Sequence, residues 1–167
     1  LGFIDFKNAY DSVNHDALER AMRAVGLYEA DVRLARAMLA NQSHRCVTAH
    51  GLTNRVSGWG PSGVAQGATE SPLLFGIMLE PLLRELDMHC REHGFNIGST
   101  TVCVQAYADD MVLISETEHG LQAMLDVVAD YCQATGLRVQ VGTPQKEDGK
   151  WTIPPAKSAT MHLNSAR

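Results

Sequence analysis

The sequence predicts an α+β fold in which helices back an antiparallel sheet. Three observations predict it: an apolar run at the start of the chain, two strand-like runs that flank a pair of carboxylates, and several amphipathic stretches with helical spacing. Strand-like and helical spacings follow one another in mixed order along the chain, without the regular strand-helix alternation of a parallel sheet. With 167 residues, 45% hydrophobic and 20% charged, the composition is that of one globular domain.

The first elements follow from local signals. The apolar run Leu-Gly-Phe-Ile at residues 1–4 is typical of a buried strand, and Asp5 stands at its end. Asn14 is a suitable N-cap for a helix with helically spaced apolar residues, which Gly26 closes. A second helix is predicted at about 29–40.

The middle of the chain predicts a hairpin and then a long helix. Two alternating runs within residues 44–59 surround a turn-rich stretch, which is a hairpin signal. Residues 71–91 have apolar positions at helical spacing. We expect Ser71 to cap this helix, Pro72 to occupy its first position and Pro81 to kink it.

Two adjacent carboxylates mark the next element. Residues 101–105 and 111–114 are predicted strands, and Asp109 and Asp110 lie at their junction. A solvated turn would tolerate such a pair. A divalent cation would remove their repulsion, and Mg²⁺ is usually held by one or two carboxylates together with water and substrate phosphates. Asp5 ends another strand, so the three groups are expected to converge on two metals about 3.5 to 4 Å apart.

The last predicted elements are a helix and two strands. Apolar spacing predicts a helix that begins near residue 121 and stops at Gly136, followed by strands at 137–141 and 159–163. Two helices on an antiparallel sheet correspond to a ferredoxin-like arrangement.

Three motifs in this order resemble the palm of a reverse transcriptase, in particular the non-LTR retrotransposon and group II intron type. They are Phe-Ile-Asp-Phe-Lys-Asn-Ala-Tyr-Asp-Ser-Val-Asn-His at 3–15, Gly-Val-Ala-Gln-Gly-Ala-Thr-Glu-Ser-Pro-Leu-Leu-Phe at 63–75, and Tyr-Ala-Asp-Asp at 107–110. The resemblance is strongest over residues 1–115 and weaker to the end of the chain. It implies one palm domain over 1–167 with part of the fingers, the hairpin at 44–59 lying on the fingers side.

The resemblance implies RNA-directed DNA synthesis, in which a primer 3′-hydroxyl attacks the α-phosphorus of a dNTP. Asp5 and Asp109 would bridge two Mg²⁺ ions, for which Mn²⁺ is a possible substitute. Asp110 would contribute more weakly, and the backbone carbonyl of Phe6 would complete one coordination shell. A strand-end cap is the alternative for Asp5 taken alone.

Further residues acquire substrate-binding roles from the resemblance. Tyr10 would lie under the incoming sugar and exclude a 2′-hydroxyl, although core packing is the alternative. The amides of Asn8 and Ala9 would hold the triphosphate. Gln66 and Gly67 would lie next to the nucleotide or template. Tyr107 and Ala108 would lie next to the primer terminus, and Ala108 is equally a turn residue.

The chain departs from the family pattern after Val139. A polar insertion at about 142–153 delays the expected lysine, so we assign the leaving-group role to Lys157 rather than Lys146. A solvated lysine is the alternative for Lys157.

Charge and cysteine content bear on partners and location. The net charge is −5, which is unexpected for a chain that should bind an RNA template and a DNA primer. We expect a fragment whose missing fingers and thumb supply the cations. No stretch resembles a membrane span or signal peptide. Four widely spaced cysteines suggest reduced, mostly buried thiols and argue against zinc. We expect an intracellular protein, nuclear if the retroelement is eukaryotic.

Two other functions remain open at this stage. A noncatalytic, RNA-binding palm of the maturase type is one, although all three carboxylates are present. An RNA-dependent RNA polymerase is the other, and Tyr10 and Ala108 favour the DNA-synthesising branch.

Overall fold

A computed structural model describes residues 1–40, 43–54, 56–57, 62–141, 145–147, 150–152 and 158–160. Its main sheet has four strands in the order β12, β1, β9, β8, and each neighbouring pair is antiparallel. The strands are β1 (Gly2–Asp5), β8 (Val104–Tyr107), β9 (Asp110–Leu113) and β12 (Ala159–Thr160). In chain order, the fourth strand of this sheet, β12, therefore lies beside the first, β1. The third strand, β9, lies between the first and the second, β8. This is the expected ferredoxin-like arrangement.

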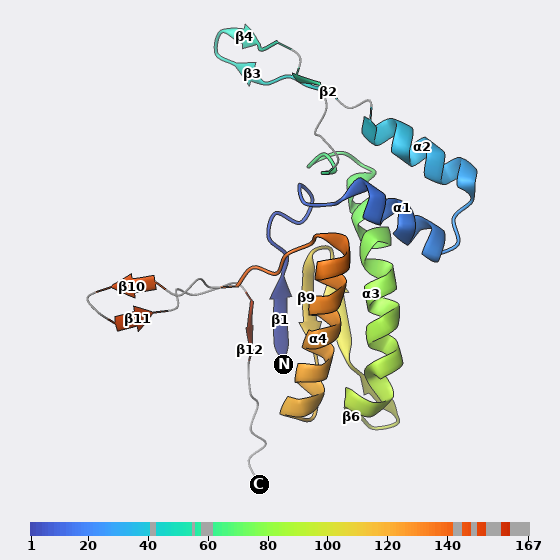
Figure 1. The fold of residues 1–167 in the computed structure, drawn as a ribbon, viewed down its shortest axis with the longest axis vertical. Helices are drawn as coiled ribbons and strands as arrows, with labels where there is room; N and C mark the ends of the chain where they lie inside the picture. The colour runs from blue at the N-terminus through green and yellow to red at the C-terminus, as the bar shows by residue number, and fades with distance from the viewer. Residues whose placement is uncertain are drawn as a thin grey trace.

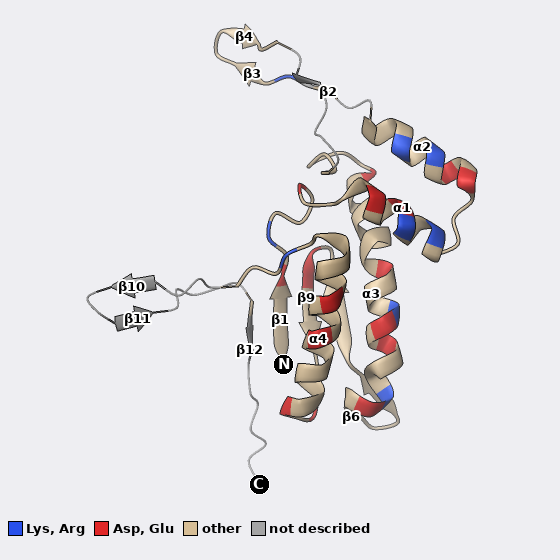
Figure 2. Ribbon diagram, in the orientation of Figure 1, with Lys and Arg blue, Asp and Glu red and all other residues tan. Residues whose placement is uncertain are grey.

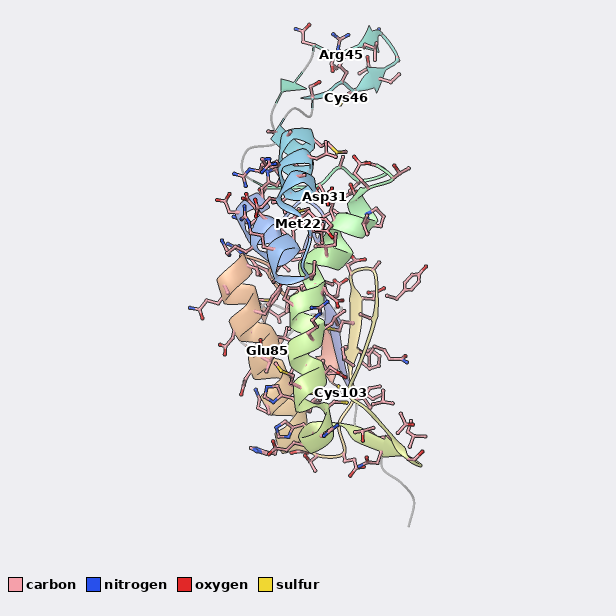
Figure 3. The ribbon with its side chains drawn as sticks, turned by 90° about the vertical axis from the view of Figure 1, so that its right-hand side faces the viewer. Met22, Asp31, Arg45, Cys46, Glu85 and Cys103 are labelled. Atoms are coloured by element: carbon pink, nitrogen blue, oxygen red, sulfur yellow. The ribbon has the colours of Figure 1, made fainter. Side chains whose placement is uncertain are left out.

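Two long helices, α3 (Ser71–His93) and α4 (Glu118–Thr135), cover one face of the sheet (Figures 1 and 3). Strand side chains alternate between the two faces. Ile4, Met111 and Leu113 point into the helix layer and are at most 5% exposed. The core therefore lies between sheet and helices, and the opposite face of the sheet is left for other uses.

Helix α1 (His15–Ala24) packs against α3, and α2 (Glu29–Ala40) packs against α1 (Figure 1). The expected cap is confirmed, because the Asn14 side chain accepts a hydrogen bond from the Ala17 amide at 2.9 Å. Arg23 and Arg36 form ion pairs along the exposed α1 and α2 surfaces. Figure 2 shows these alternating charges, which contribute little each because they are exposed.

The predicted hairpin at 44–59 is present, but its first strand is interrupted after His44. The described residues of this segment form four short strands: β2 (Ser43–His44), β3 (Val47–Thr48), β4 (Gly51–Leu52) and β5 (Val56–Ser57). β2 pairs with β5, and β3 pairs with β4. The chain turns earlier than expected because Gly51 adopts a φ of +109° and the Thr48 hydroxyl donates to the Gly51 carbonyl at 2.7 Å. Residues 55 and 58–61 lie outside the described part.

The start of α3 also differs from expectation. Glu70, not Ser71, is the N-cap residue, and Pro72 follows inside the first turn. The Ser71 hydroxyl instead donates to the Ala65 carbonyl at 2.6 Å, so the preceding loop uses the group that would have capped the helix. The helix then continues through Pro81 to His93.

The predicted strand at 101–105 divides at Cys103. Its first part is β7 (Thr100–Val102), which pairs with β6 (Phe95–Ile97) in a hairpin that the sequence did not predict, and its second part is β8 of the main sheet. No helix in the described part of the chain is long and apolar enough to cross a membrane.

The final strands are only partly as expected. Residues 137–141 form no strand, but an isolated bridge joins Phe6 to Val139. The predicted strand at 159–163 is described only as β12, and 161–163 lie outside the described residues. The polar insertion contains the hairpin β10 (Gln145–Glu147) and β11 (Lys150–Thr152), which extends away from the main sheet (Figure 1).

Candidate active site

The strand register places three polar side chains in one row. Asp5 of β1 lies directly opposite Asp110 of β9, and Asp110 lies directly opposite Tyr107 of β8. Because Ile4 and Met111 face the helices, this row belongs to the other face. The side chain environments differ: Asp5 is 9% exposed, whereas Tyr107 is 86% exposed.

Asp109 stands in the turn between β8 and β9. The turn has two residues, and Ala108 takes a φ of +53°, a conformation that non-glycine residues adopt uncommonly. The half-buried Asp109 lines the same cavity as Asp5. The three carboxylates thus share one end of the sheet as predicted, although their oxygens do not all come within 4.8 Å of one another.

The cavity has a volume of about 460 Å³ and contains most of the predicted site. Its lining residues are Asp5, Phe6, Lys7, Asn8, Ala9, Tyr10, Gln66, Asp109 and Gln140. A second hollow of about 550 Å³ shares Tyr10, Gln66 and Asp109 with it, and Gly67 lines that second hollow. The two spaces together form a groove that runs past the carboxylates.

Tyr10 is held on the wall of this groove by an aromatic contact. Its ring stacks on Phe75 of α3 with centroids 5.3 Å apart and an interplanar angle of 27°. Phe6 meets the Phe75 ring edge-on, with the ring centroids 6.4 Å apart. One side of Tyr10 therefore packs against the core while the residue still borders both spaces.

Backbone hydrogen bonds tie the Gln66 loop to the segment after Tyr10. The Val64 amide donates to the Tyr10 carbonyl at 2.9 Å, and Gly63 donates to Val13 at 2.8 Å. The buried His15 ring is hydrogen-bonded through Nε2 to the Gly63 carbonyl at 2.8 Å. No role was predicted for His15, although it ends the first motif.

Backbone geometry explains why glycine stands at position 67. Gly67 has a φ of +85°, and a Cβ built there would meet no atom within 4 Å. Backbone conformation, rather than crowding in this structure, therefore accounts for glycine. The Gln66 amide donates to Asp11 at 3.5 Å, a long contact at the surface.

Two residues that sequence reasoning missed hold the Asp5 backbone. The Gln140 amide donates to the Asp5 carbonyl at 2.7 Å, and the Asp5 amide donates to the Ser158 hydroxyl at 3.1 Å. No sequence pattern marks either one. Lys7, next to Asp5, also lines the cavity. Lys157 lies outside the described residues, and Lys146 is in β10.

The donor atoms at this site suit a hard divalent cation. Asp5 and Asp109 offer carboxylate oxygens at a cavity with openings toward solvent, and Asp110 stands opposite Asp5 on the same face of the sheet. Oxygen is the ligand that Mg²⁺ prefers. Opposed carboxylates destabilise a sheet unless a cation or hydrogen bonds offset their repulsion. The residues therefore fit hard divalent cations.

The sheet order, the carboxylates at one sheet end and the adjoining groove define the palm of a nucleic acid polymerase. Residues 1–142 match the family model described as "Reverse transcriptase (RNA-dependent DNA polymerase)". The chain belongs to this reverse transcriptase family.

Curated relatives are Pol polyproteins of retrotransposable elements. The chain is 29% identical to that of the type-2 element R2DM of Drosophila melanogaster, over 93% of this chain and 15% of the relative. It is 32% identical to that of the type-1 element R2 of Nasonia vitripennis, over 99% of this chain and 15% of the relative. The chain thus spans about 15% of the length of these relatives.

A solved structure has the same fold at low sequence identity. An apo telomerase from Candida tropicalis, truncated from the C-terminal domain, superimposes with a TM-score of 0.60 at 16% identity. The match covers 83% of this chain and 28% of the telomerase chain.

Proposed function

We propose that this chain is the catalytic palm of a retroelement reverse transcriptase, which transfers dNMP from a dNTP to a primer 3′-hydroxyl on an RNA template. The observation that carries the proposal is the cross-strand pair Asp5 and Asp110, with Asp109 in the adjoining turn and in the cavity that Asp5 lines. The family membership and the R2 relatives support the same chemistry.

Asp5 and Asp109 are proposed as the main ligands of two Mg²⁺ ions. When bound, such ions polarise the attacking hydroxyl and neutralise charge on the leaving pyrophosphate. Asp5 is well placed as a ligand because backbone bonds to Gln140 and Ser158 fix the end of its strand. Asp110 is more exposed, which suits a weaker contribution.

The groove wall is proposed to position the nucleotide. Tyr10 lies where its free side would meet the sugar, and Gln66 borders the same space. Asn8 adopts a φ of +49° in the turn that follows β1. A left-handed residue within a turn is typical of backbone nests that bind anions, which supports the triphosphate role of the Asn8 and Ala9 amides.

The test is primer extension on an RNA template by a polypeptide that joins this chain to the flanking regions of its R2 relatives. We expect Asp5→Asn and Asp109→Asn to lower the rate by roughly 100-fold or more, the scale of losing one preorganised charge contact. Asp126→Asn is the matched control, because Asp126 is an exposed carboxylate that contacts Gln122 on α4.

The same assay separates this function from the alternatives. A palm that only binds RNA would retain template binding and give no extension in any variant. Preferential use of NTP over dNTP would indicate an RNA polymerase. Equal rates for Asp5→Asn and the control, with both proteins folded by circular dichroism, would disprove the assigned site.

A further inference from the structure

A second cluster of ligand side chains lies at the end of the sheet opposite the carboxylates. It consists of Asp87, Cys90 and Cys103, and one donor atom from each lies within 4.8 Å of the others. Among the described residues, no other group of three or more His, Cys, Asp or Glu is gathered this closely. Cys103 precedes β8, whose far end leads to the catalytic turn, so the two sites are distinct. Figure 3 labels Cys103 beside α3.

The fold brings these three residues together for definite reasons. Asp87 and Cys90 are three residues apart on α3 and therefore share one face of the helix. The chain then turns back at Gly94, where a Cβ would lie only 2.5 Å from the Cys90 carbonyl oxygen. The Ile114 amide donates to the Cys103 carbonyl at 2.7 Å and fixes the backbone on the other side.

The surroundings leave the cluster open on one side. Cys90 and Cys103 are 7% and 2% exposed, whereas Asp87 is exposed. The thiols interact with each other and form long sulfur hydrogen bonds to backbone carbonyls, Cys90 to Thr101 at 3.7 Å and Cys103 to Leu86 at 3.5 Å. Such weak contacts are readily exchanged for stronger ones.

We propose that Asp87, Cys90 and Cys103 bind a thiophilic divalent cation, Zn²⁺ in the first instance, with solvent as the fourth ligand. Two sulfurs and one carboxylate oxygen are a donor set that Zn²⁺ accepts. Thiolates select zinc over magnesium, so this site would not compete for the ions of the oxygen-only site. The bound ion would link α3 to the junction of β7 and β8.

The test uses Co²⁺ as a spectroscopic probe for Zn²⁺ with the purified, reduced chain. We expect thiolate-to-cobalt absorption and tetrahedral visible bands that saturate at one equivalent and disappear when Zn²⁺ is added. The melting temperature should rise with free Zn²⁺, since an ion that binds only the folded state stabilises it. Cys46→Ser should behave like the parent, because Cys46 is an exposed thiol between β2 and β3.

Variants of the ligands decide the outcome. Cys90→Ser should abolish the cobalt absorption, and Asp87→Asn should weaken binding by roughly tenfold or more. Because Asp87 is exposed, its variant keeps the folded core intact. The proposal is overturned if the folded parent gives no thiolate-to-cobalt absorption, or if either variant binds Co²⁺ as tightly as the parent does.

Discussion

At the scale of single residues, Tyr10 has two roles that need to be separated. One side of its ring stacks on Phe75, and the residue also borders the groove beside Asp109. Stacking of this kind adds about 0.5–1.5 kcal/mol beyond simple burial. The same side chain therefore supports the fold and is proposed to select the sugar.

Replacing Tyr10 should change sugar selection. In the R2-flanked polypeptide, Tyr10→Val should raise NTP use relative to dNTP use by at least about tenfold, which is roughly 1.4 kcal/mol, because the clash with a 2′-hydroxyl is removed. The measurement is the ratio of the two incorporation efficiencies. Phe75→Leu is the control, since it removes the ring stack and keeps the Tyr10 side chain. If Phe75→Leu shifts the ratio equally, the effect arises from packing.

Tyr131 shows how burial changes a titration. Its hydroxyl donates to the Met78 carbonyl, and burial, followed by the nearby Cys132, raises the pKa of Tyr131 to about 12. The protonated phenol is thus favoured in the folded state. The stability that the folded protein gains from this pKa shift is fully present below pH 10, the ordinary pKa of the group. It is lost as the pH rises toward 12.

Tyr131→Phe should therefore alter both stability and its pH dependence. We expect the variant to unfold about 1 kcal/mol more easily at pH 8, because a hydrogen bond is lost. Its free energy of unfolding should then fall less steeply than that of the parent between pH 10 and 12. Urea titrations at several pH values measure both effects, and parallel curves for the two proteins would contradict the assigned titration.

At the scale of elements, two glycines in or next to α3 differ in the space beside them. Gly76 lies within the helix, and a Cβ there would meet nothing within 4 Å. Gly94 follows the helix, and a Cβ there would lie 2.5 Å from the Cys90 carbonyl oxygen and 2.7 Å from Thr101. Its φ of −73° suits any residue, so only space requires glycine.

Two alanine variants should thus move stability in opposite directions. Gly76→Ala should raise the free energy of unfolding by about 0.8–1 kcal/mol through helix propensity. Gly94→Ala should lower it by roughly 1–3 kcal/mol, the usual effect of overpacking. Denaturant unfolding monitored by circular dichroism compares the pair. A neutral Gly94→Ala would mean that the turn into β6 adjusts without loss.

At the scale of the whole molecule, charge limits what the chain does alone. Residues 61–130 contain eleven acidic side chains and two basic ones, Arg84 and Arg91. Figure 2 shows the acidic residues spread over α3 and α4. A duplex of template and primer carries dense negative charge, and its binding needs Lys and Arg. We therefore expect cations outside residues 61–130 to offset this surface.

We expect residues 1–167 alone to extend a primer poorly even with the carboxylates intact. Joining the flanking regions of the R2 relatives should restore extension and make template binding fall steeply with salt. Filter binding and primer extension at increasing salt concentrations test this. Processive extension by the 167 residues alone would show that cations from flanking regions matter less than the charge suggests.

The sequence by itself determined the helices and the residue types of the site. Apolar periodicity located the four helices of the described residues to within a few positions, because amphipathic patterns depend on local spacing. The motifs around Asp5 and Asp109 identified the family, which the match of residues 1–142 confirms.

Only the tertiary structure decided how these parts meet. The division of residues 100–107 at Cys103 depends on which neighbour each half pairs with, which local pattern does not record. The contacts of Asp5 with Gln140 and Ser158, and the cluster of Asp87, Cys90 and Cys103, join residues far apart in the chain. Chain spacing carries no signal for such contacts, because they arise from the packing of helices against the sheet.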